Sequence, residues 1–69
     1  MTHQFSSIIN KENDLYVAFC PELDIASQGK TIEEALRNLK EAIELYLEDE
    51  DVTYVSPEFK PLVTLIEVK

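Results

Sequence analysis

The sequence is poor in the residues that small proteins use for covalent or metal cross-links. It holds one cysteine and one histidine among 69 residues. A disulfide within the chain is therefore excluded, and a structural zinc site, which takes four Cys or His ligands, is not expected. One domain of this size buries only about 60% of the surface that its unfolded chain exposes. Self-association as a dimer or tetramer is the remaining way to enlarge the core.

Basic residues and long hydrophobic runs are also scarce. Six Lys and Arg stand against fourteen Asp and Glu, which gives a net charge of −8. Nucleic acids and anionic membranes are bound through basic groups, so we expect neither as a direct partner, whereas a basic protein would be attracted. No signal peptide or membrane span is visible. With an unpaired cysteine, which is typical of a reducing compartment, these absences predict a cytoplasmic protein.

Two segments near the N-terminus are rich in β-branched and aromatic residues. They lie at 4–10 and 15–20, and the residues between them include the turn formers Asn13 and Asp14. Such a pattern is typical of a β-hairpin.

Residues that interrupt regular structure follow the second predicted strand. Pro21 has no backbone N–H to donate, so it ends that strand or introduces a bulge. A third short strand is predicted within 23–29. Gly29 is the only glycine, and we expect it to hold a turn open by adopting a positive φ. Residues 62–68 carry apolar residues on both faces and predict a last strand that is central or lies at an interface.

Thr31 begins the clearest element. The run Thr-Ile-Glu-Glu (31–34) matches a capping box, in which Thr31 accepts from the amide of Glu34 and the Glu34 carboxylate reaches back to the amide of Thr31. Apolar residues then recur at spacings of three and four, which predicts an amphipathic helix over about 32–48. This stripe consists of Ile32, Ala35, Leu36, Leu39, Ala42, Ile43, Tyr46 and Leu47.

The expected fold is therefore one α+β domain over residues 1–69, with the order β-β-β-α-β. A small antiparallel sheet would carry one amphipathic helix on one face, and a single helix leaves the other face uncovered. Along 15–20, alternate side chains lie on opposite faces. An uncovered apolar face usually marks a binding surface for a second copy or a partner. We expect it to carry Tyr16, Ala18, Cys20, Val63 and Leu65.

Few residues suggest catalysis. Cys20 has no basic neighbour in the sequence to lower the pKa of its thiol, so we expect a small buried apolar residue rather than a nucleophile. His3 stands near the chain terminus, where a lone histidine is usually incidental. The sequence predicts no catalytic residue, no metal ligand and no cofactor.

The acidic residues are the better candidates for function. Glu22 and Asp24 are two residues apart at a predicted strand end, a spacing that can point both carboxylates the same way. Such a pair could bind Mg²⁺ or serve as acid and base, but a partner-facing pair or a solvated loop is the simpler interpretation. The acidic run 48–51 opposes the helix dipole, which either a basic partner or the end of the helix would explain. The candidate partner-binding residues are Glu22, Asp24, Asp49, Glu50 and Asp51.

Residues 16–48 combine four motifs in a specific order. They are a Tyr-x-Ala strand, a Pro-Glu-Leu turn, a Gly-x-Thr-x-Glu-Glu-Ala helix start and an Asn-x-x-Glu-Ala-Ile continuation. In this combination the stretch resembles the N-terminal domain of HicB-type antitoxins. The matching residues are Tyr16, Ala18, Pro21, Glu22, Leu23, Gly29, Thr31, Glu33, Glu34, Ala35, Asn38, Glu41, Ala42 and Ile43.

The resemblance implies a partial ribonuclease H-like fold without nuclease function. It also implies a partner, a small basic mRNA-cleaving toxin of the HicA type, whose catalytic histidine or RNA-binding face the antitoxin would cover. Many relatives carry a further C-terminal DNA-binding domain, and this sequence stops after its last predicted strand. An orphan oligomeric scaffold without a toxin, or a nuclease that retains Mg²⁺-dependent activity, are the alternative interpretations.

Overall fold

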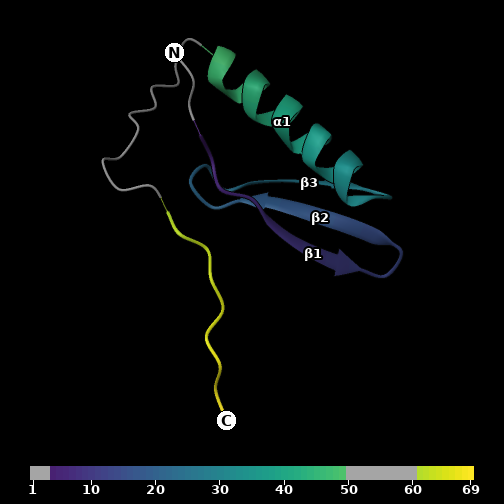
Figure 1. Cartoon of the computed structure of the whole chain (residues 1–69). Coiled ribbons are helices and arrows are strands. Elements are labelled where there is room, and N and C mark those ends of the chain that lie inside the picture. The colour runs from purple at the N-terminus through teal and green to yellow at the C-terminus, as the bar shows by residue number, and fades with distance from the viewer. Residues whose placement is uncertain (1–3, 50–60) are drawn as a thin grey trace.

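The computed structural model describes residues 4–49 and 61–69 of the protein. Three strands form one antiparallel sheet in the order β1-β2-β3, and one helix follows them and lies across the sheet (Figure 1). The α+β class and the order of three strands followed by a helix are as predicted. The elements are β1 (Ile8–Glu12), β2 (Leu15–Cys20), β3 (Ile25–Gly29) and α1 (Ile32–Glu48).

A two-residue turn joins β1 to β2. Glu12 pairs with Leu15 at the end of the ladder, which leaves Asn13 and Asp14 as the turn. Asn13 has a φ of 55°, a left-handed conformation that asparagine adopts more readily than most residues. The hairpin is therefore confirmed, although β1 lies at 8–12 rather than at 4–10.

The helix begins with the predicted cap. The Glu34 amide donates to Thr31 Oγ1 at 3.0 Å. The Glu34 carboxylate accepts from the amide of Lys30 at 2.9 Å, one residue before the expected amide of Thr31. At the other end the amide of Asp49 donates to the carbonyl of Tyr46 at 3.3 Å. Both ends of α1 are thus defined by contacts between residues that lie three or four positions apart in the sequence.

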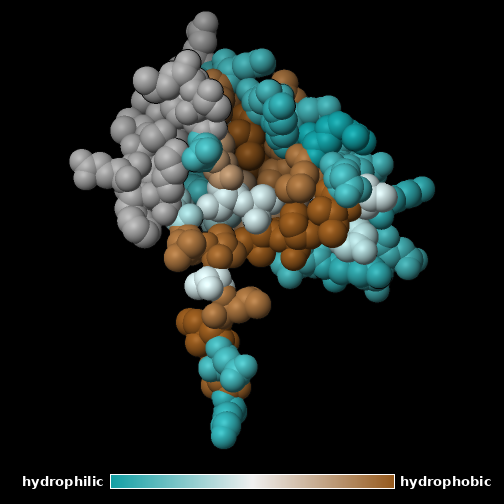
Figure 2. Space-filling model, in the orientation of Figure 1, coloured by the Kyte–Doolittle hydropathy of each residue, from teal (hydrophilic) through white to brown (hydrophobic). Residues whose placement is uncertain are grey.

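Four buried apolar residues form the core between α1 and the sheet. Ala18 and Cys20 project from β2, and Ala35 and Leu39 meet them from α1. The helix lies mainly over β3 and β2. Burial of Cys20 is as predicted. Hydrophilic side chains cover the outer side of α1, while hydrophobic ones gather between the helix and the strands (Figure 2).

The face assignment made from sequence is wrong. Ala18 is fully buried under α1 rather than exposed. Tyr16 packs against the same core, and Lys11 Nζ lies 5.6 Å from the centre of its ring. The physical reason is size: the small side chains of Ala18 and Cys20 let a helix approach the sheet closely. The larger Leu15, Val17 and Phe19 therefore lie on the face away from α1.

Gly29 serves the close approach of the helix rather than a turn with positive φ. It is the last residue of β3 and has no positive φ, contrary to the prediction. A Cβ added there would lie 2.6 Å from the Ala35 nitrogen and 2.8 Å from the Glu34 Cβ. Only a residue without a side chain lets the first turn of α1 lie this close to β3.

The last predicted strand does not form in this structure. Residues 61–69 are exposed and are assigned to no strand or helix, and they run away from the sheet (Figure 1). The expectation for 62–68 is therefore wrong for the single chain. A strand is defined by hydrogen bonds to a neighbouring strand, and an alternating pattern alone does not supply that neighbour.

Candidate interaction surfaces

Glu22 fastens the segment before β1 to the turn after β2. Its Oε2 accepts from the amide of Ser6 at 2.9 Å, and the Sγ of Cys20 lies 3.5 Å from its Oε1. The side chain is half-buried. The Ser6 amide is thus held by a carboxylate instead of a ladder partner, which fits the start of β1 only at Ile8.

These contacts perturb the titration of both side chains. Burial raises the pKa of the Cys20 thiol, which keeps it protonated and opposes a nucleophilic role. For Glu22, burial alone would raise the pKa, but hydrogen bonds from the Ser6 amide, from its own amide and from Cys20 lower it. Glu22 is therefore a charged structural acceptor at neutral pH.

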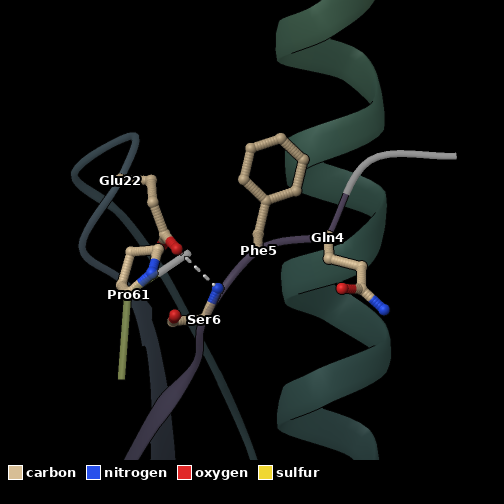
Figure 3. A pocket seen from close by; sticks show the side chains of 5 residues that line it. All are labelled: Gln4, Phe5, Ser6, Glu22 and Pro61. Carbon is tan, nitrogen blue, oxygen red and sulfur yellow. Dashed lines mark hydrogen bonds between the residues drawn. The ribbon is translucent and has the colours of Figure 1, made fainter. Parts of the chain in front are cut away.

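A hollow of about 360 Å³ lies beside this fastening. Glu22 and Pro61 border one side, and the chain from Gln4 through Phe5 to Ser6 borders the other (Figure 3). The Glu22 carboxylate turns towards the Ser6 amide, whereas the amide of Gln4 points away from it. Among the described residues that line the hollow, Glu22 is the only carboxylate, so these residues offer no pair for acid–base work.

Of the other sequence-predicted acids, the two that the structure describes, Asp24 and Asp49, do not line the hollow beside Glu22. Asp24 is exposed and has a φ of 56°, so its role in the fold is to close the turn between β2 and β3. Asp49 is the exposed C-cap of α1. Glu50 and Asp51 lie outside the described residues. Within 4–49 and 61–69, no group of three or more His, Cys, Asp or Glu side chains is placed to hold a metal ion.

The outer side of α1 carries the main acidic surface of the described chain. Its exposed acids are accompanied by two cations, Arg37 and Lys40, which lie in the first two-thirds of the helix. The last turn has no basic residue. The helix dipole places partial negative charge at this same end, so the dipole and the acidic side chains both contribute negative potential there. We call these residues the acidic surface: Glu33, Glu41, Glu44, Glu48 and Asp49.

A second candidate surface is the sheet face away from α1. Leu15, Val17 and Phe19 form its central row on β2, and Ile8 and Ala26 flank Phe19 across the ladders. The row is only half-buried. No helix or strand of the described residues lies over it. Uncovered apolar faces of this kind are typical of contact surfaces.

Two curated proteins are similar to this chain. A UPF0150 protein of Helicobacter pylori (strain J99) is 58% identical over 45 residues, which cover 64% of this chain and 62% of that protein. A UPF0150 protein of Synechocystis sp. (strain PCC 6803) is 50% identical over 48 residues, which cover 67% of this chain and 61% of that protein. Over these residues the chain is similar to both UPF0150 proteins. It spans less than two thirds of the length of either relative. No family model and no solved structure matches it.

Two residues with structural roles were not identified from the sequence. Ser6 is sixteen positions from Glu22, and nothing local marks such a pair. Asn38 lies outside the apolar stripe that predicted the helix. Its Nδ2 donates to the carbonyl of Gln28 at 2.8 Å and ties α1 to β3. The motif Asn-x-x-Glu-Ala-Ile was the only signal that singled Asn38 out.

No helix of the described residues is long and apolar enough to cross a membrane.

Proposed function

We propose that this protein is a non-enzymatic, cytoplasmic binding module that neutralises a small basic mRNA-cleaving toxin of the HicA type. The observation that carries the proposal is the acidic surface, whose negative field is strongest at the end of α1. The motif set of residues 16–48, which resembles HicB-type antitoxins, and the net charge of −8 support it. A basic ribonuclease needs its cationic face to hold RNA, so an acidic protein that covers this face competes with the phosphate backbone.

Electrostatic docking of this kind predicts a salt-dependent association rate. Opposite fields steer encounter, so the association rate constant should fall steeply as salt rises. The acidic surface should contribute more than Glu22, because the Glu22 carboxylate already accepts from Ser6 within the fold. Asp24 is exposed in the turn between β2 and β3 and remains a candidate contact.

The test begins with capture of partners by the tagged full chain from its own cell extract. A captured small basic protein supports the proposal only if it cleaves RNA and this chain inhibits that cleavage. The double variant Glu44→Gln/Glu48→Gln should then slow association by about tenfold at low salt. The matched control Glu12→Gln/Asp14→Asn changes the charge equally at the β1–β2 turn, away from the last turn of α1 (Figure 1), and should bind normally. Equal effects of the two variants would rule out the acidic surface as the docking site.

An orphan oligomeric module is the second candidate function, favoured by the uncovered face around Leu15, Val17 and Phe19. Recovery of the tagged chain bound only to copies of itself, with no inhibited ribonuclease, would favour this alternative and contradict the antitoxin proposal.

A further inference from the structure

The two edges of the sheet differ in how well they are protected. At the β3 edge, α1 lies close by and Asn38 Nδ2 occupies the carbonyl of Gln28. At the β1 edge, no strand of the described residues pairs with Ile8–Glu12 on the side away from β2. Half of the backbone groups of an edge strand point outward, and natural sheets usually cover or pair them. The β1 edge is thus the open one.

The C-terminal segment 62–68, which we call the arm, is an exposed apolar segment without a neighbouring strand among the described residues. Its apolar residues lie on both faces, as in a strand covered on two sides, and no strand of the described residues pairs with it. Its apolar side chains are 52% to 95% exposed, and they are Leu62, Val63, Leu65, Ile66 and Val68. They lie on both faces of an extended chain, so the arm needs cover on two sides.

The described residues of a single chain offer cover on one side only. Beside β1, one face of the arm would meet the helix side of the sheet, near Phe5 and Ile9, which pack against the core. Its other face would extend the uncovered apolar row of Leu15, Val17 and Phe19 and would remain exposed. A second copy covers this face only if the apolar rows of the two copies pack together beside the arms. The arm also leads away from its own sheet (Figure 1).

Charge favours the same arrangement. Two chains of net charge −8 repel, and the acids of the outer side of α1 would be a poor meeting point. The arm carries a single charge, on Glu67, and β1 carries Lys11 and Glu12, which cancel. The arm and the β1 edge are therefore the nearly neutral part of the molecule, where two copies can approach.

We propose that two copies of this chain form a dimer by exchanging arms, with residues 62–68 of each copy added as a strand along the β1 edge of the other. The exchange is reciprocal, so one two-fold axis satisfies both edges and closes the assembly. Strand addition supplies backbone hydrogen bonds, and the apolar side chains of the arm supply contacts on both faces. The dimer leaves the acidic surface of each copy on the outer side of α1.

The first experiment measures mass in solution for the full chain and three variants, by size-exclusion chromatography with light scattering. The wild type should have twice the chain mass of 7.9 kDa. Leu65→Asp and Ile66→Asp place a charge on opposite faces of the arm and should each weaken dimerisation about a hundredfold. Leu45→Asp is the matched control, because Leu45 is an exposed apolar residue of α1, and it should remain dimeric. All three should keep the helical circular dichroism of the wild type.

The second experiment decides which edge the arm occupies. Mixed samples of ¹⁵N-labelled and ¹³C-labelled copies should show intermolecular contacts between the β1 amides of one copy and the arm methyl groups of the other. A monomeric wild type, with or without its arm on its own β1, would overturn the proposal. So would a dimer that survives Leu65→Asp and Ile66→Asp, which would place the contact on the uncovered sheet face instead.

Discussion

The contact between Gly29 and the start of α1 gives the sharpest quantitative prediction. A Cβ at position 29 would lie 2.6 Å from the Ala35 nitrogen and 2.9 Å from the Glu34 carbonyl carbon. Both are backbone atoms, so no side-chain rotation relieves the contact. Ordinary contact begins at 3.4 Å; the first turn would have to move by about 0.8 Å, a distance at which neighbouring van der Waals contacts are lost.

That movement would act directly on the core. Ala35 belongs to the same turn and packs on Ala18 and Cys20, so lifting the helix would loosen these contacts. Overpacking of this kind costs about 1–3 kcal/mol. Replacing glycine in a strand recovers about 0.5–1 kcal/mol of backbone entropy. The midpoints of these two ranges give a net loss of about 1 kcal/mol in the free energy of unfolding for Gly29→Ala, and the upper limit is about 2.5 kcal/mol. Tm should fall by about 4–8 °C for each kcal/mol lost in a domain of this size.

Urea unfolding at one fixed protein concentration measures this change, since association would otherwise shift the midpoint. Gln28→Ala is the control, because Gln28 is exposed and its backbone carbonyl still accepts from Asn38. We expect the control to change stability by no more than about 0.5 kcal/mol. An unchanged or raised midpoint for Gly29→Ala would refute the close packing of β3 against α1.

Three further substitutions test local features of the fold, each by urea unfolding. Glu22→Gln removes a charged hydrogen-bond acceptor. At pH 7 it should lower the free energy of unfolding by no more than a charged hydrogen bond contributes, about 1.5–3 kcal/mol, because the half-buried site is partly hydrated. Because the folded-state pKa of Glu22 is lowered, its contribution is present above the unfolded pKa and is lost as pH falls through the folded pKa. The difference between wild type and variant should therefore shrink in acid, and a difference independent of pH would contradict the charged hydrogen bond. Thr31→Ala should cost about 0.5–2 kcal/mol through the lost N-cap, whereas no loss would show that the cap is dispensable. Asn13→Val should cost about 1–2 kcal/mol because φ at this position is left-handed, and Asn13→Gly should be tolerated; equal stability of both would argue against the turn geometry.

The candidate sites depended on information that lies far apart in the sequence. The sequence singled out Glu22 as a partner-binding residue, which stays a prediction. Its hydrogen bond within the fold was not predicted, because its partner Ser6 is too distant for any local pattern to identify. Asp24 gave no hint of its positive φ beyond being a residue type that tolerates it. The pairing of Glu22 with Asp24 was a hypothesis about side-chain direction, and direction in a turn is set by backbone angles that the residue types only partly restrict.

The sequence by itself determined α1, its cap and the β1–β2 hairpin. These features depend on residues within three or four positions of one another, as in the contact between Thr31 and Glu34, so a short window contains their whole cause. The tertiary structure alone decided which face of β2 the helix covers. Alternation separates Tyr16, Ala18 and Cys20 from Leu15, Val17 and Phe19, but it does not rank the two faces. The helix covers the face with the small side chains, because they allow a close approach that bulkier side chains prevent. These residues are Ala18, Cys20, Gly29 and Ala35.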